Sequence, residues 1–429
     1  MKSWIPIIYI TIIAFIGCRS PGIDIFGKKT PHNKYEQKLK DAGLNESALG
    51  KAWLYMADWS LQNPVIIQLP FREAGYFSGD KAHASGYVFN AQRGEFINVT
   101  LDKKPLKDFD VFLDLWKLSR DSIPGNLTYA DTTHFNFEVE EDGAYILRLQ
   151  PELLRNGNYT LTITTGPSLA YPVQAPGKES IQSFWGASRD GGNRFHEGVD
   201  IFAARYTPVT AAADGRISRV NVNNLGGKVI FMRLKDRNIS LYYAHLDSQL
   251  VHIGQSVKAG DTIGLLGNSG NAITTAPHLH FGIYTSGGAI DPLPFIKPSN
   301  KEPANITSPL DKLGNFAKTG SRSINTSWNG KPLTILPNTY VYIQGAASNE
   351  YKVVLPDSIS IFINNSMISG LNPIRKIKVS ADTNIYDQPN LQAFQKGKIF
   401  NGDEVDVIAG YNDFFYIKNT DGLEGWLKH

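Results

Sequence analysis

Short segments in which apolar and polar residues alternate restrict most strongly how this chain can fold. Between Pro70 and Pro167 the alternation recurs in "YVFNAQRGEFINVTL", "DVFLDLWKL", "HFNFEVEEDGAYILRLQ" and "NYTLTITTG", with Gly, Asn, Asp or Pro at the breaks. Successive side chains of a strand point to opposite faces, so a period of two predicts half-buried strands joined by turns. We therefore predict a mainly β chain, with a β-sandwich over residues 70–169.

The N-terminus has the features of an export signal. Lys2 is followed by an apolar run from Trp4 to Gly17 and then by Cys18, the only cysteine among the 429 residues. A membrane-spanning helix needs roughly 20 apolar residues, and a shorter run is typical of a signal peptide. The alternative is an uncleaved membrane anchor that carries an incidental cysteine. Because there is no second cysteine, disulfides cannot stabilise the exported fold, and packing or a metal must do so.

The segment that ends at Cys18 resembles a bacterial lipobox, in which the cysteine is lipidated and becomes the mature N-terminus. The resemblance implies a lipoprotein signal peptide over residues 1–18 and attachment to a membrane of the bacterial envelope through lipid on Cys18. Arg19 stands where an inner-membrane lipoprotein carries Asp. The expected location is therefore the outer membrane, facing the periplasm.

A tether and a helical segment are expected over residues 19–69. Residues 19–33 are rich in Pro, Gly, Lys and Asn, and two helical patterns follow. One lies near residues 34–42, and the other starts after Asn45 as N-cap and stops before Pro64. The net charge of the whole chain is only +3, and it contains no long Lys/Arg run. Nucleic acid is therefore excluded as a partner.

Five of the nine histidines lie between His196 and His280. In "APHLHFGIY", His278 and His280 alternate with Leu279 and Phe281, which predicts a strand with both imidazoles on one face. "HEGVD", from His196 to Asp200, looks like the zinc-protease motif HExxH with Asp as its last residue. That motif requires a helix, and Gly198 with the following "VDIFAARYTP" does not continue one, so Glu197 is not expected to be the base.

Zinc chemistry suits these residue types. A catalytic zinc commonly takes three ligands from His and Asp or Glu and keeps a fourth position for water. His196, Asp200 and one of the pair His278 and His280 can supply the three ligands. The remaining imidazoles, including His245 in "LYYAHLD", can act as acid–base or oxyanion groups. The alternative is that these histidines are structural and unrelated to one another. The combination of HxxxD, HxH and a third histidine argues against it.

At these residues the chain resembles the catalytic domain of lysostaphin/LytM-type zinc metalloendopeptidases. The strings that carry the resemblance are "HEGVDI", "TPVTAAADGRI", "YYAHLD", "VKAGDTIGLLGNSG" and "PHLHFGIY". It implies an antiparallel-sheet peptidase domain over residues 175–299 that cuts peptide bonds in peptidoglycan cross-links, with stem peptides as partners. It further implies Zn²⁺ on His196, Asp200 and His280, with His245 and His278 as catalytic histidines.

The last part of the chain contains an internal repeat. With a shift of 64 residues, "VYIQGAASNEYKVV" from Val341 falls on "VDVIAGYNDFFYIK" from Val405, and Phe362 falls on Trp426. Two short-strand units of this size predict two small barrels, a degenerate one over residues 310–372 and a second over residues 373–429. The second resembles the bacterial Src-homology-3-like barrels of cell-wall enzymes.

Two other classes of function compete with the peptidase. A non-catalytic envelope scaffold, or an activator of other wall hydrolases, could use the same fold, but it would be expected to have lost site residues, and all five are present. A biotinyl- or lipoyl-type carrier is suggested by "GQSVKAGDTIGLLG". Such a carrier needs an acceptor lysine in a Met-Lys-Met or Asp-Lys-Ala hairpin tip, and this sequence has neither there.

Overall fold

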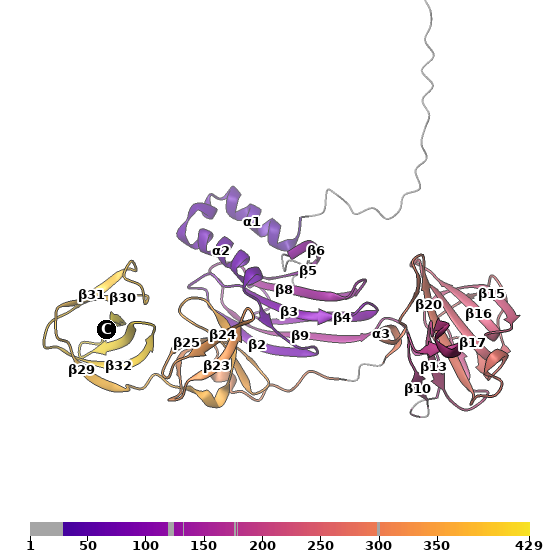
Figure 1. Ribbon diagram of the computed structural model, residues 1–429. Helices are drawn as coiled ribbons and strands as arrows, with labels where there is room; N and C mark the ends of the chain where they lie inside the picture. The colour runs from indigo at the N-terminus through magenta and orange to yellow at the C-terminus, as the bar shows by residue number, and fades with distance from the viewer. Residues whose placement is uncertain (1–28, 119–123, 132, 176, 178, 298–300) are drawn as a thin grey trace, which may run out of the picture.

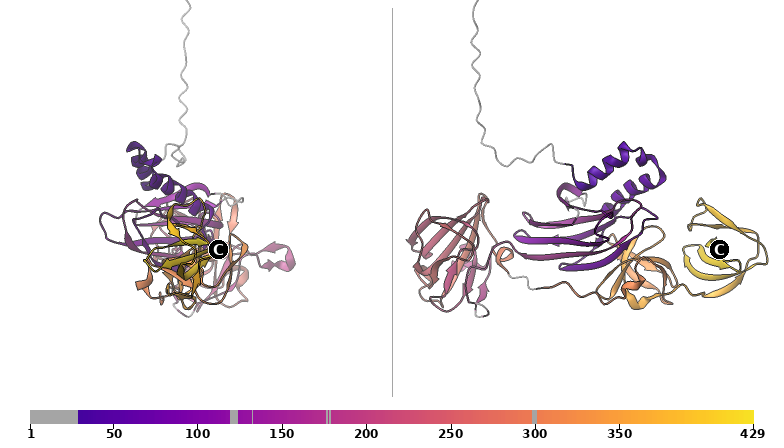
Figure 2. Two further views of the ribbon diagram at one scale, coloured as in Figure 1. Left: turned by 90° about the vertical axis from the view of Figure 1, so that its left-hand side faces the viewer. Right: turned by 180° about the vertical axis from the view of Figure 1, so that it is seen from behind.

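The protein is an elongated, mainly β molecule. The computed structural model describes residues 29–118, 124–131, 133–175, 177, 179–297 and 301–429, so the predicted signal peptide and Cys18 lie outside the described residues. The central domain lies at one end, the predicted sandwich in the middle and the C-terminal units at the other end (Figures 1 and 2). The predicted fold class is confirmed. Within the described ranges, no helix has the length and apolar character needed to cross a bilayer.

Two helices cover one side of the sandwich (Figure 1). They are α1 (Pro31–Asp41) and α2 (Ala48–Gln62). The N-cap of α2 is Ser47, whose hydroxyl accepts a hydrogen bond from the Gly50 amide. The prediction of Asn45 as the cap was wrong, because Asn45 lies in a short 3₁₀ turn before the helix. The fully buried Trp53 joins α2 to the sandwich, since its indole N–H donates to the Pro151 carbonyl at 2.8 Å.

The sandwich consists of two sheets that enclose an aromatic-rich core, and all their strand pairs are antiparallel except the parallel pair β1 and β3. One sheet has the order β1-β3-β8-β5-β6, and the other contains β2, β9, β4 and β7 as neighbours. The strands are β1 (Val65–Ile66), β2 (Phe71–Phe77), β3 (Ser85–Ala91), β4 (Glu95–Lys104), β5 (Val111–Leu118), β6 (Pro124–Asp131), β7 (His134–Glu138), β8 (Gly143–Pro151) and β9 (Gly157–Pro167).

The central domain is built on one ten-stranded antiparallel sheet. Its main path runs β10-β13-β20-β17-β16-β15-β18, while β14 and β19 pair with each other and β21 pairs with β20. The elements of this domain are β10 (Ser180–Ser183), β11 (Ser188–Arg189), β12 (Arg194–Phe195), β13 (Val199–Phe202), β14 (Pro208–Thr210), β15 (Gly215–Asn223), β16 (Gly227–Leu234), β17 (Ser240–Gln249), β18 (Ser256–Val257), β19 (Thr262–Leu266), β20 (His278–Thr285), β21 (Gly288–Ile290) and α3 (Leu293–Ile296).

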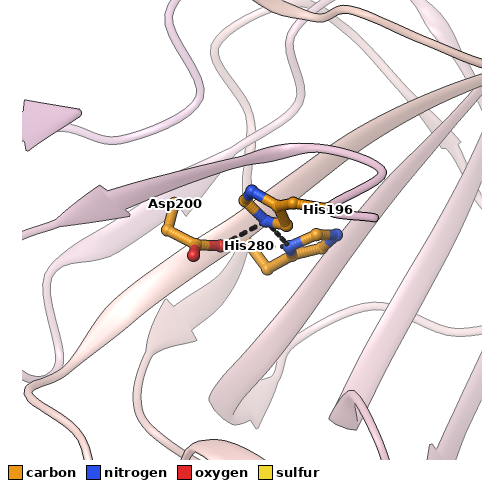
Figure 3. Close-up of side chains that lie close together, drawn as sticks. All are labelled: His196, Asp200 and His280. Atoms are coloured by element: carbon orange, nitrogen blue, oxygen red, sulfur yellow. Dashed lines mark hydrogen bonds and ion pairs between the residues drawn. The ribbon is translucent and has the colours of Figure 1, made fainter. Parts of the chain in front are cut away.

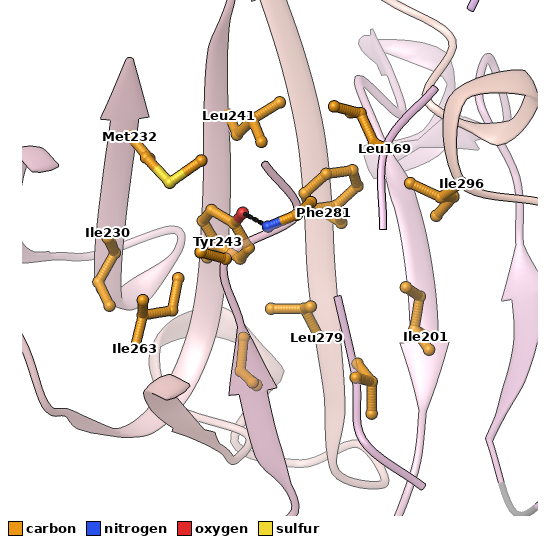
Figure 4. Packing of buried hydrophobic residues seen from close by; sticks show 14 of the residues in the cluster. Leu169, Ile201, Ile230, Met232, Leu241, Tyr243, Ile263, Leu279, Phe281 and Ile296 are labelled. Carbon is orange, nitrogen blue, oxygen red and sulfur yellow. Dashed lines mark hydrogen bonds between the residues drawn. The ribbon is translucent and has the colours of Figure 1, made fainter. Parts of the chain in front are cut away.

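The core of the central domain packs against one face of this sheet (Figure 4). Leu279 and Phe281 of β20 are fully buried there beside Tyr243 of β17. The Tyr243 hydroxyl accepts a hydrogen bond from the Ala212 amide at 3.0 Å, so its one polar atom is satisfied within the core. Burial of these side chains leaves the alternate residues of β20 on the opposite face.

The C-terminal region contains the two units of the repeat. The strands of the first are β22 (Phe316–Thr319), β23 (Ile324–Trp328), β24 (Lys331–Ile335), β25 (Tyr340–Ala347), β26 (Glu350–Val354), β27 (Ser360–Asn364) and β28 (Ile368–Ser369). The strands of the second are β29 (Arg375–Lys378), β30 (Thr383–Tyr386), β31 (Gln395–Ile399), β32 (Glu404–Tyr411), β33 (Phe414–Asn419) and β34 (Glu424–Lys428).

The hairpins of the two units correspond at the predicted shift of 64 residues. Ile343 pairs with Val353 in the first unit, and Val407 pairs with Ile417 in the second. Each hairpin has a bulge directly after that position, and the third strand follows in the same register in both units. The repeat is therefore structural, whereas the likeness to Src-homology-3 barrels stays a prediction.

The first unit differs from the expected separate barrel, because its strands continue the sheet of the sandwich. Ala346 and Gly345 of β25 pair with Ala74 and Gly75 of β2, which gives a nine-stranded sheet. Alternation within a segment predicts that a strand forms, but it does not identify a partner strand some 270 residues away. The predicted domain boundaries otherwise remain predictions.

A buried ion pair lies across this junction. Lys352 Nζ is 2.7 Å from Glu73 Oε1, and both side chains are fully buried. The hydroxyls of Tyr87 and Tyr159 donate to the same carboxylate oxygen at 2.8 and 2.6 Å. The Glu73 carboxyl group packs directly against Gly345, where a Cβ would lie only 2.8 Å from it, so a larger residue would not fit. The junction thus depends on a charge pair that neither unit completes alone.

We expect Lys352→Met to destabilise the protein by about 3–5 kcal/mol, because it leaves the Glu73 carboxylate buried and without a cation. Denaturant unfolding followed by tryptophan fluorescence measures the change. Lys398→Met is the control, since Lys398 pairs with Asp382 at the surface and its loss should change the free energy of unfolding little. Equal stability of Lys352→Met and the parent protein would contradict the structural role of the pair.

Candidate active site

The strand predicted for "HLHFGIY" is confirmed. β20 runs from His278 to Thr285, and Leu279 and Phe281 point into the core. His278 and His280 therefore share the opposite face of the sheet. Two strands flank β20: β13 pairs with it on one side, and β17 pairs with it on the other.

The register between β13 and β20 brings distant residues together. Asp200 lies directly opposite His280. His196, just before β13, completes a cluster in which His196 Nε2, Asp200 Oδ1 and His280 Nδ1 lie 2.9–3.0 Å from one another (Figure 3). Gly198 makes this approach possible, because a Cβ there would come within 2.7 Å of the His280 ring. The three side chains predicted as metal ligands are thus gathered at one point.

The donor set of this cluster fits a zinc ion. His196 Nδ1 donates to the Phe184 carbonyl at 2.9 Å, so Nε2 keeps the lone pair that a metal needs. Three ligands with bonds of about 2.0–2.1 Å in tetrahedral geometry would lie about 3.3 Å apart, close to the observed spacing. No other group of three such side chains converges in the same way within the described residues. Two imidazoles and one carboxylate are ligands that zinc commonly takes.

The protonation states of Asp200 and His280 also favour metal binding. Burial by itself would raise the pKa of Asp200, but the imidazoles of His196 and His280, each 3.0 Å from Oδ1, lower that pKa well below its usual range. Burial lowers the pKa of His280. The site therefore presents a carboxylate and a neutral imidazole near neutral pH, which are the forms that bind a cation.

His245 reaches the same region through a β-bulge. The register of β16 with β17 shifts between Lys228 and Ile230, and His245 has a φ of 59° in the left-handed region. For a residue other than glycine this conformation costs roughly 1–3 kcal/mol and is typical of functional positions. The His245 amide is nevertheless satisfied, because it donates to the Gly226 carbonyl at 2.7 Å.

The rings of His245 and His278 lie side by side, with centroids 4.9 Å apart. His245 Nδ1 donates to the Ser269 carbonyl and His278 Nδ1 to the Ala276 carbonyl, each at 2.8 Å. The Nδ1 atoms are thus occupied, and Nε2 of each ring can accept a proton or a hydrogen bond. Burial, followed by the charges of His278 and His280, lowers the pKa of His245 to about 4, so this ring is neutral near pH 7.

Two charged residues near the cluster, Glu197 and Arg189, were treated differently by the sequence analysis. No helix forms at His196–Asp200, which agrees with the rejection of an HExxH motif. The carboxylate of Glu197 is exposed and accepts a hydrogen bond from the Tyr284 hydroxyl. Arg189 was missed: its Nη2 donates to Asp200 Oδ2 at 2.8 Å. No spacing rule connects Arg189 with Asp200, because they meet through the β11–β12 hairpin and the loops beside it.

Comparison with known proteins assigns the segment that carries these residues to a family. Residues 194–292 match peptidase family M23. The central domain is an M23 peptidase domain. The match includes the three clustered side chains and both further histidines. The roles of the individual residues remain proposals.

Three similar proteins illustrate the match of the M23 domain. The L-Ala–D-Glu endopeptidase of Bacillus subtilis is 36% identical over 140 residues, covering 30% of this chain and 43% of the relative. The murein hydrolase activator NlpD of Salmonella dublin is also 36% identical over 140 residues, covering 32% and 34%. The solved catalytic domain of lysostaphin from Staphylococcus simulans is 36% identical, covering 28% and 92%, with a TM-score of 0.26. The chain thus spans less than half the length of these two curated relatives.

We expect metal affinity to be greatest near about pH 7.5 and to fall as the pH is lowered toward about 5, because protons compete for imidazole nitrogens whose ordinary pKa is about 6.5. Because burial lowers the pKa of His280, proton competition at this ligand is shifted to lower pH than for an ordinary imidazole. Competition titrations with a chelating indicator at several pH values measure the affinity. A zinc affinity that stays constant over this range would argue against histidine ligands.

Proposed function

We propose that the protein is a zinc metalloendopeptidase that hydrolyses peptide bonds in peptidoglycan cross-links at the bacterial envelope. The observation that carries this proposal is the convergence of His196, Asp200 and His280 beside two further histidines in an M23 domain. The relatives' names support the substrate class, since one is an L-Ala–D-Glu endopeptidase. Stem peptides of peptidoglycan are the proposed partner.

The three clustered side chains are the proposed zinc ligands. These residues would hold zinc, and the chemistry it would supply is polarisation of the scissile carbonyl and a strongly lowered pKa of a bound water, to about 7. The chain's own contribution is to hold the ligands in their metal-binding forms. Carbonyl hydrogen bonding fixes the tautomer of His196, and burial keeps His280 neutral.

His245 and His278 are the proposed catalytic histidines. Because each Nδ1 donates to a carbonyl, each Nε2 starts as a hydrogen-bond acceptor and can take a proton. Once protonated, the same atom can donate a hydrogen bond to a developing oxyanion or to the leaving amine. The ring of His278 also stacks on Phe202 at 4.8 Å between centroids, which orients it.

The proposed location is the outer membrane, facing the periplasm, through lipid on Cys18. The support comes from the sequence: an apolar run of signal-peptide length ends at the single cysteine, and Arg19 follows it. The predicted tether to residue 33 is too long, because α1 already begins at Pro31, so residues 19–30 would act as the tether. Two acyl chains on one cysteine supply the two anchoring signals that stable membrane attachment requires.

One observation favours the alternative of a non-catalytic activator, because a murein hydrolase activator matches this domain at the same identity over the same number of residues as the endopeptidase. An activator has no need of a metal site or of paired histidines. The presence of all five side chains in one place, with the tautomer of His196 set for metal binding, therefore favours the enzyme.

Variants of the two histidines of β20 test the proposal. His280→Ala removes one of three ligands, so zinc content and activity should both collapse. His278→Ala leaves the three ligands in place, so zinc should stay while activity falls by roughly 10²–10⁴-fold, the usual contribution of an acid–base group. The assay is digestion of purified peptidoglycan by soluble protein lacking residues 1–18, with products identified by mass and metal measured in parallel.

His252→Ala is the control for these variants, because His252 is exposed and lies outside the cluster. It should retain both zinc and activity. Loss of zinc in His278→Ala with retention in His280→Ala would reverse the assignment. A parent protein that binds zinc and releases no fragments from peptidoglycan would favour the activator.

Anchoring is tested separately by Cys18→Ala. The variant should be released from membranes or fail to be processed, because the lipid-bearing side chain is missing. Cell fractionation and the mass of the mature protein measure the outcome. If the variant sediments with membranes like the parent and has the same mature mass, Cys18 is not lipidated.

A further inference from the structure

Arg189 is placed to act on two of the three proposed ligands at once. Its Nη2 donates to Asp200 Oδ2 at 2.8 Å and to Ser183 Oγ at 2.6 Å. Ser183 Oγ in turn lies 3.2 Å from His196 Nδ1, next to the carbonyl that already accepts from that ring. One guanidinium nitrogen of Arg189 therefore contacts the Asp200 carboxylate directly and the His196 imidazole indirectly, through Ser183.

Because of this contact, the two carboxylate oxygens of Asp200 have different partners. Oδ1 faces His196 and His280, whereas Oδ2 is occupied by Arg189. A carboxylate free at both oxygens can rotate and bind a metal through both of them. With Oδ2 held, only Oδ1 is available, which keeps a coordination position open.

We propose that Arg189 is a positioning residue that holds Asp200 as a one-oxygen metal ligand and, through Ser183, restrains the ring of His196. The inference rests on the proposed zinc site and extends it to a residue outside the ligand set. Two effects oppose each other here. The positive guanidinium repels a metal cation, whereas the orientation of the ligands favours binding, and loss of such an orienting partner typically weakens metal affinity by roughly 10–100-fold.

Zinc affinity decides between these effects. Arg189→Met should weaken zinc binding by roughly 10–100-fold in a chelator competition assay with the soluble chain lacking residues 1–18. Arg189→Lys keeps the charge without the planar fork and should lose less. Ser183→Ala retains the bond to Asp200 and should also lose less. In cobalt-substituted protein, the visible absorption should change in Arg189→Met, because it reports coordination geometry.

Arg205→Met is the matched control, because Arg205 forms a similar ion pair with Asp247 at 2.6 Å in the same domain without touching a proposed ligand. Its zinc affinity should equal that of the parent. Thermal unfolding of each metal-free variant establishes that it is folded.

Unchanged or tighter zinc binding by folded Arg189→Met would overturn the inference, even if the parent protein digests peptidoglycan. A parent protein that binds no zinc would overturn both the inference and the proposed function. A loss of affinity in Arg189→Met equal to that in Arg205→Met would also count against a specific role.

Discussion

The antiparallel register between β13 and β20 is the constraint on which the site depends. Val199 pairs with Phe281 and Ile201 with Leu279, and all four side chains lie in the core. A slip of one residue would expose this apolar set and turn the histidines inward. The hydrophobic partners therefore fix the register, and the register places Asp200 opposite His280. Packing on one face of the sheet thus determines the chemistry on the other.

Backbone carbonyls orient the imidazoles of the site. Nδ1 of His196, His245 and His278 each donates to a carbonyl within 2.8–2.9 Å. These bonds select one tautomer and direct Nε2 away from the backbone. Only His280 uses Nδ1 toward the cluster. The acceptors lie in the loop after β10 and in the connection between β19 and β20, so the conformation of these two loops sets the tautomers of the site.

The M23 domain and the C-terminal units are joined to the sandwich in different ways. On the M23 side the contacts include a hydrogen bond from the Leu169 amide to the Phe295 carbonyl and an ion pair between Arg237 and Glu138. On the other side the sheet itself continues into β25, with the buried pair of Lys352 and Glu73 beside it. Separation of the first C-terminal unit would break the pairing of β2 with β25 and divide Lys352 from Glu73, which would lose its cation.

The sequence by itself determined the strands, the repeat and the types of candidate ligand, because these depend on local periodicity and residue type. It left His278 and His280 as alternatives for the third ligand, and only the family resemblance favoured His280. The face shared by His278 and His280 follows from the period of a strand, and the shift of 64 residues recovers matching hairpins. Only the tertiary structure decided which strands pair. It placed Arg189 on Asp200, turned His245 into the site through a bulge, and joined β25 to β2. These outcomes depend on contacts between residues distant in the chain, and no local pattern of side chains encodes such contacts.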